Sequence, residues 1–112
     1  TLGGVDSLLD RLDAFLEREG ISGLDVLKMD VQGFELEILK GAARALAEGR
    51  IRFVYAEVGF APLDREQTYF PALHERLEAG GFGLCGFYEA WNHGPRREWL
   101  GFCNALYRRR DA

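Results

Sequence analysis

The sequence of 112 residues lacks the marks of several common classes of protein. It has only two cysteines, Cys85 and Cys103, and neither stands near a second Cys or a His at metal-ligand spacing. This argues against a zinc finger and against a disulfide-rich secreted scaffold. Both cysteines stand in apolar, strand-like runs, so we expect two buried free thiols, as in proteins of the reducing cytosol.

Long apolar runs and an excess of basic side chains are also missing. No run reaches the ~18 residues that a membrane span needs, and we find no secretory signal sequence. The 14 basic and 18 acidic side chains give a net charge of −4, which argues against electrostatic binding of nucleic acid. We interpret the basic cluster Arg108–Arg110 as a solvated tail. We therefore expect a cytoplasmic protein without nucleic-acid or membrane partners.

Helical and strand-like patterns alternate along the sequence, and 47% hydrophobic content is enough for one packed domain. Gly20, Gly49 and Gly80–Gly81 follow the helical patterns as stop signals. Short apolar strands separated by helices predict an α/β fold with a mostly parallel sheet covered on both faces. The last third predicts an antiparallel β-hairpin. We expect helices at 6–19, 34–48 and from a capping Thr68 onward, strands at 24–30, 51–58, 82–89 and 100–107, and a hairpin loop at 92–97.

Polar side chains follow the expected strands at their carboxyl ends, where ligands bind in open parallel sheets. These side chains are candidates without reference to any family. In strand order they are Asp30, Gln32 and Gly33, then Glu57, then Tyr88 and Glu89, and in the hairpin loop Asn92, His93, Arg96 and Arg97.

Most of these candidates also have a purely structural explanation. Asp30 can simply cap the helix that follows it, and Glu35 can be a first-turn partner of the helix dipole. Asp30 and Glu57 together could hold Mg²⁺ through oxygen ligands, although nothing in the sequence specifies such a site. The residues for which a structural role competes with a functional one also include Lys28, Gln32, Glu57, His93 and Asn104.

Residues 28–42, KMDVQGFELEILKGA, closely resemble the pattern K-I-D-V-E-G-x-E-x-x-V-L-K-G-A of the FkbM methyltransferase family. Weaker similarity covers nearly all of the chain, including Glu57 after an apolar strand and the closing segment Cys103–Tyr107. The family more often has Glu where this sequence has Gln32. We therefore do not assign proton abstraction to Gln32.

The resemblance implies the C-terminal half of a class I, Rossmann-like methyltransferase fold with three layers. Residues 1–112 would form one partial domain that holds strands four to seven of that fold. Enzymes of this class bind the cofactor through a glycine-rich turn after the first strand, and no G-x-G-type turn follows an expected strand in this sequence. We expect the cofactor-binding half to be absent, the isolated chain to be inactive, and strand 24–30 to be an exposed edge prone to self-association.

The resemblance also implies transfer of a methyl group from S-adenosyl-L-methionine to a hydroxyl of a sugar or another small molecule. In the complete domain we expect Asp30 to orient or deprotonate that hydroxyl, with Glu57 as a second polar wall. We expect no residue of this chain to bind the cofactor or a metal ion. The alternative is a non-catalytic fragment or interaction module that binds no cofactor. The residues expected to recognise the acceptor are Gln32, His93, Arg96 and Arg97.

Overall fold

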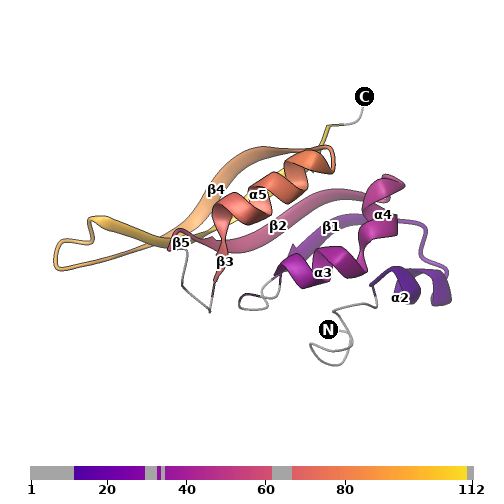
Figure 1. The fold of residues 1–112 in the computed structure, drawn as a ribbon, viewed down its shortest axis with the longest axis horizontal. Coiled ribbons are helices and arrows are strands. Elements are labelled where there is room, and N and C mark those ends of the chain that lie inside the picture. The colour runs from indigo at the N-terminus through magenta and orange to yellow at the C-terminus, as the bar shows by residue number, and fades with distance from the viewer. Residues whose placement is uncertain (1–11, 30–32, 34, 62–66, 111–112) are drawn as a thin grey trace.

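The computed structural model describes residues 12–29, 33, 35–61 and 67–110. They form a single sheet with helices packed against it (Figure 1). The order of elements agrees with the α/β pattern expected from the sequence, with one further short strand. The elements are α2 (Leu12–Arg18), β1 (Leu24–Met29), α3 (Glu35–Gly41), α4 (Ala43–Ala47), β2 (Ile51–Gly59), β3 (Thr68–Tyr69), α5 (Phe70–Ala79), β4 (Phe82–His93) and β5 (Trp99–Arg109).

The sheet has the strand order β1-β2-β5-β4, and β3 pairs with the end of β2. β1 and β2 are parallel, as the strand–helix–strand pattern predicts. β5 lies antiparallel between β2 and β4, so β4 runs in the same direction as β1 and β2. Strands β1 to β4 thus run in one direction, and β5 is the antiparallel strand that the expected terminal hairpin adds, here inserted between β2 and β4. The carboxyl ends of β1, β2 and β4 point toward one edge, which we call the site edge.

The hydrophobic core lies between the helices and one face of the sheet. Side chains alternate along β2, so every second residue from Val54 to Val58 is buried. β5 contributes the matching row from Cys103 to Tyr107, in register with β2. The helices add Leu12, Leu16, Ile38, Leu39, Leu46, Leu73 and Leu77 to the same cluster.

The other face of the sheet, which we call the open face, is not covered by any helix of the described residues. Val26 of β1 is 52% exposed and Tyr88 of β4 is 47% exposed. β1 buries only Met29, so the expectation that this strand is covered on both sides is wrong for the described part of the chain. The reason is that the described helices all pack into one core cluster, which leaves two layers instead of three.

Helix α2 ends where the sequence predicts, at Gly20. The amide of Gly20 donates to the carbonyl of Glu17 at 3.2 Å, and the amide of Ile21 donates to the carbonyl of Leu16 at 2.9 Å. Gly20 has φ 69°, a left-handed conformation that glycine adopts without a Cβ clash. This pair of hydrogen bonds is the Schellman arrangement, which satisfies the last carbonyls of the helix.

The expected helix 34–48 is two helices, α3 and α4, with a break at Ala42. The start of α4 is capped from another helix. Oδ2 of Asp13 accepts the amide of Arg44, and its Oδ1 accepts the amide of Ala45, both at 2.8 Å. A single periodic stripe cannot reveal this break, because the capping carboxylate comes from α2, about thirty positions earlier.

The third helix starts later than expected. Thr68 does not cap it, because Thr68 lies in β3 opposite Val58 and its hydroxyl binds elsewhere. The N-cap of α5 is Tyr69, and Pro71 follows within the first turn. The hairpin strands are longer than expected, so His93 ends β4 and does not belong to the loop.

Two further expectations about the end of the chain are corrected. Cys103 is buried, but Cys85 is exposed, because the β4–β5 register shifts between Leu84 and Gly86 and releases Cys85 from the ladder. Arg108 and Arg110 are exposed as expected, but the cluster is not a free tail, because Arg108 and Arg109 belong to β5. Arg109 donates to the carbonyl of Leu46 at 3.2 Å, and Arg110 lies 3.2 Å from a carboxylate oxygen of Glu78.

Candidate functional site

The site edge joins two parts of the predicted site. Glu57 stands near the end of β2, and the β4–β5 hairpin projects beyond that edge (Figure 1). Asp30 and Gln32, the candidates that follow β1, lie outside the described residues. Their proposed roles therefore stay predictions.

Glu57 lies on the open face and is partly buried. It stands opposite Asn104 of β5 in the antiparallel register. Residues directly opposite in such a ladder share one face, so the carboxylate and the amide belong to the same surface. This is the position that the strand pattern predicts for Glu57. For Asn104, the sequence alone does not decide between a structural role and contact with a ligand.

Next to them the open face carries a polar cluster centred on Glu89, to which we refer as the Glu89 cluster. Oε2 of Glu89 accepts the hydroxyl of Tyr55 at 2.6 Å and the amide Nδ2 of Asn104 at 3.0 Å. The cluster thus joins side chains of β2, β4 and β5. Lys28 of β1 places its ammonium 5.9 Å from the centre of the Tyr55 ring, and the Tyr88 ring lies 6.5 Å away from the Tyr55 ring.

The backbone of β4 directs Glu89 toward this cluster. Glu89 has φ 55°, a left-handed conformation that is uncommon for a residue with a side chain. It sits at a register shift between Tyr88 and Trp91. Such bulges re-aim side chains and occur often next to active sites. Sequence reasoning named Glu89 only as a strand-end residue and missed Tyr55, because a register shift leaves no signal in hydrophobic alternation.

The Glu89 carboxylate controls the ionisation of Tyr55. The hydrogen bond to Glu89, helped by partial burial, raises the pKa of Tyr55 to about 12. Tyr55 therefore remains a neutral hydroxyl donor at physiological pH. The cluster presents fixed donors and acceptors on the open face, a property suited to binding polar ligand groups or an adjoining polar surface.

The hairpin residues do not join this cluster. His93 is exposed and stacks on Trp91, with ring centres 5.9 Å apart. The amide of Arg96 donates to Oε1 of Glu98 at 3.1 Å, and Arg97 is exposed with φ 53°. His93 stands opposite Trp99 at the far end of the β4–β5 ladder, whereas Glu57 stands opposite Asn104. The structure thus places His93, Arg96 and Arg97 beyond the site edge, apart from the predicted catalytic carboxylate.

The hairpin also carries aromatic side chains that the sequence reasoning did not single out. Trp91 stacks on Phe102 with ring centres 5.3 Å apart, and Trp99 is 61% exposed. Exposed aromatic residues gathered on one element mark a contact surface. The alternation of apolar and polar residues does not predict these exposed aromatic side chains, because neither face of the distal hairpin packs against the core.

A buried carboxylate, Glu35, lies close to the site edge and belongs to the motif at residues 28–42. Glu35 is 1% exposed. Its Oε1 accepts the amide of Gly33 at 3.1 Å and the hydroxyl of Thr68. The place of Glu35 at the start of α3 fits the helix-dipole role that the sequence suggests. The bond to Thr68 leaves no signal in the sequence, because it depends on how β3 packs against α3.

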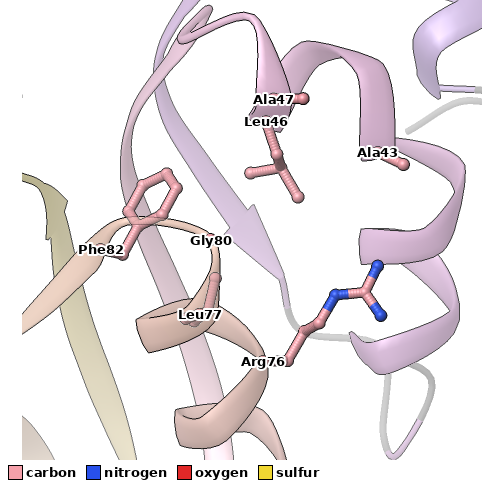
Figure 2. Close-up of a pocket in the computed structure, with 7 residues that line it drawn as sticks. All are labelled: Ala43, Leu46, Ala47, Arg76, Leu77, Gly80 and Phe82. Carbon is pink, nitrogen blue, oxygen red and sulfur yellow. The ribbon is translucent and has the colours of Figure 1, made fainter.

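The cavity shown in Figure 2 lies at the opposite edge of the sheet. It has a volume of about 150 Å³ and is lined by α4, by the end of α5 and by Phe82, the first residue of β4. Leu46 and Phe82 supply apolar walls, and Arg76 supplies the one charged group of the lining. α4 precedes the amino end of β2, and α5 precedes that of β4, so this cavity is remote from the site edge.

Among the residues that the structure describes, no three His, Cys, Asp or Glu side chains gather in a way that could hold a metal ion. The idea that Asp30 and Glu57 share Mg²⁺ stays a prediction, because Asp30 lies outside those residues. None of the described helices is long and apolar enough to cross a membrane.

Comparison with known proteins gives one assignment. No curated protein and no solved structure matches the chain. The sequence model of the Methyltransferase FkbM domain matches residues 9–84, which is more than half of the chain and includes both β1 and β2. The resemblance seen in the sequence is confirmed, and the chain belongs to the FkbM methyltransferase family.

Proposed function

We propose that this chain is the acceptor-binding half of a methyltransferase domain that methylates a hydroxyl of a sugar or another small molecule. The observation that carries the proposal is the family match across β1 and β2, the two parallel strands whose carboxyl ends form the site edge. Ligands of open α/β sheets bind at such an edge. The donor would be S-adenosyl-L-methionine, as methyltransferase membership implies in general.

The residues of this chain do not by themselves fit that cofactor. The sequence has no G-x-G-type turn after a strand. The cavity between α4 and α5 has a volume of about 150 Å³, whereas pockets for small-molecule ligands and cofactors have volumes of roughly 300 Å³ or more. It also lies at the wrong edge of the sheet. We therefore place cofactor binding in another part of the complete domain, and not in the cavity between α4 and α5.

The open face supports the proposal of a missing partner segment. Parallel strands normally have both faces of their sheet covered. Here Val26, Tyr55 and Tyr88 lie on a face without a covering helix in the described residues. β1 is also an edge strand, with β2 as its one described neighbour. A second half of the domain would cover the open face and pair with β1, and only the assembled domain would be active.

The roles of the individual residues follow from their chemistry. Asp30 would orient or deprotonate the acceptor hydroxyl, which requires the carboxylate to lie within about 3 Å of that proton. Glu57 would form the second polar wall, on the same face as Asn104. The residues proposed for acceptor recognition remain Gln32, His93, Arg96 and Arg97, of which the last three require the acceptor to reach the hairpin.

The substitution Asp30→Asn tests the catalytic role in the complete domain. We expect turnover to fall about 100-fold, because removal of a general base typically costs that much, while the unfolding curve stays unchanged. Asp25→Asn is the matched control, since Asp25 is an exposed carboxylate of β1 that pairs with Arg52. Equal turnover in the wild type and in Asp30→Asn would reduce Asp30 to a helix cap.

The alternative is a non-catalytic module, and the poor fit to the cofactor favours it for the isolated chain. Calorimetric titration with S-adenosylhomocysteine separates the two. We expect no heat of binding with the 112-residue chain alone and clear binding with the complete domain. Absence of binding to both would contradict the methyltransferase proposal and support the non-catalytic module.

A further inference from the structure

Glu35 and Thr68 are the buried polar side chains among the described residues, with exposures of 1% and 4%. A buried carboxylate is unfavourable unless hydrogen bonds replace its lost hydration. Glu35 has such bonds. The amide of Gly33 donates to its Oε1 at 3.1 Å, and the hydroxyl of Thr68 donates to the same atom.

These bonds connect two segments of the chain near the site edge, one that follows β1 and one that follows β2. Gly33 stands between β1 and α3, directly after the sequence positions of Asp30 and Gln32, and has φ 96°. Thr68 belongs to β3, which pairs with the last residues of β2. The partners are more than thirty positions apart in the sequence, so the contact fixes one segment against the other.

We propose that Glu35 and Thr68 form a buried clamp that fixes Gly33 and the start of α3 against β3, next to the end of β2, and thereby sets the shape of the site edge. Both are positioning residues, since neither is exposed enough to meet a ligand. The effect on methyl transfer rests on the proposed function, whereas the effect on the turn does not.

The clamp is not required to hold the secondary structure itself. Helix α3 is anchored in the core by Ile38 and Leu39, which are 5% and 0% exposed. β3 is held by its ladder with β2 and continues into α5. Loss of the Thr68 hydroxyl should therefore loosen the turn at Gly33 without unfolding the chain.

Amide hydrogen exchange in the 112-residue chain tests the clamp at Gly33. Thr68→Val keeps the shape of the side chain and removes the hydroxyl, so we expect the Gly33 amide to exchange about 10-fold faster. Thr68→Ser keeps the hydroxyl and should exchange like the wild type. Glu35→Met should act like Thr68→Val, whereas Glu37→Met, a change on the same helix of a residue paired with Lys40, should have no effect.

A measurement without any variant guards against failure to fold. The wild-type chain should show a nuclear Overhauser effect between the Gly33 amide and the Thr68 side chain, because both donate to one oxygen. Its absence, or equal Gly33 exchange in Thr68→Val and Thr68→Ser, overturns the clamp.

The positioning role is tested by methyl transfer in the complete domain, with S-adenosylhomocysteine binding as the control. We expect Thr68→Val to lower turnover about 10-fold and Thr68→Ser to leave it unchanged, while both variants bind S-adenosylhomocysteine like the wild type. Equal turnover of both variants overturns the positioning role. If the wild type binds no S-adenosylhomocysteine while the exchange results hold, the proposed function fails and the clamp stands.

Discussion

At the scale of single residues, the Glu89 cluster makes a prediction about ionisation. Because the hydrogen bond to Glu89 raises the pKa of Tyr55 to about 12, Glu89→Gln should move that pKa back toward 10. The folded-state pKa lies above the unfolded one, so the stabilising contribution is complete below pH 10 and is lost as the pH rises through about 12. Titration of tyrosinate absorbance should show one more tyrosine ionising below pH 11 in Glu89→Gln.

Two controls make that titration specific. Tyr55→Phe should remove the shifted group, so that adding Glu89→Gln changes nothing further. Glu75→Gln removes an equal charge from an exposed position on α5 and should leave the titration unchanged. An unaltered curve in Glu89→Gln would mean that the carboxylate does not hold the Tyr55 proton in solution.

The same residues show what sequence reasoning can and cannot reach at this scale. Glu57 was placed correctly on a strand end because strand periodicity is local. The partners of Glu35 and Glu89 were missed, since Thr68 and Tyr55 lie more than thirty positions away from them. Contacts of this kind depend on register and topology, which a single sequence does not specify.

At the scale of elements, the break between α3 and α4 depends on a cap supplied by α2. Asp13 accepts the amides of Arg44 and Ala45, both at 2.8 Å. Asp13→Ala should lower the free energy of unfolding by about 1 kcal/mol, the usual cost of losing a helix cap. Urea denaturation of the chain measures this directly.

Glu17→Ala is the matched control for the cap. Glu17 pairs with the Arg44 side chain at 2.6 Å on the exposed surface of the same helix. Exposed ion pairs contribute little, so this substitution should shift the unfolding midpoint much less than Asp13→Ala. Equal effects of the two substitutions would show that charge on α2, and not capping of α4, stabilises the pair of helices.

Element ends were predicted well where one residue decides them. Gly20 ends α2 and Gly49 follows α4, each with positive φ, because glycine alone adopts that conformation cheaply. The start of α5 was predicted one residue too early, since threonine is favoured both as a helix cap and in a strand. Its pairing with Val58 and its bond to Glu35 decide in favour of the strand.

At the scale of the whole molecule, the sequence predicted the alternation of helices and strands and the terminal hairpin, but not the open face. The sequence of β1 predicts a strand that is buried on both sides, because its apolar residues occupy both faces. That pattern is consistent with a covering layer that the described residues do not supply. Val26, 52% exposed, is the clearest sign of the mismatch.

This mismatch predicts self-association of the isolated chain through β1 and the open face. An unpaired edge strand is a template for pairing with a second copy. Light scattering across a concentration series should detect dimers of the chain alone. Val26→Lys should raise the midpoint concentration about 10-fold, because across a two-fold axis it sets like charges near Lys28 of the second copy. Ala72→Lys adds the same charge to the exposed side of α5 and should not change the midpoint. If both variants associate as strongly as the wild type, the contact lies elsewhere, and the aromatic hairpin is the next surface to substitute. If dimers disappear when the domain is complete, the second half of the domain and the second copy compete for the same face.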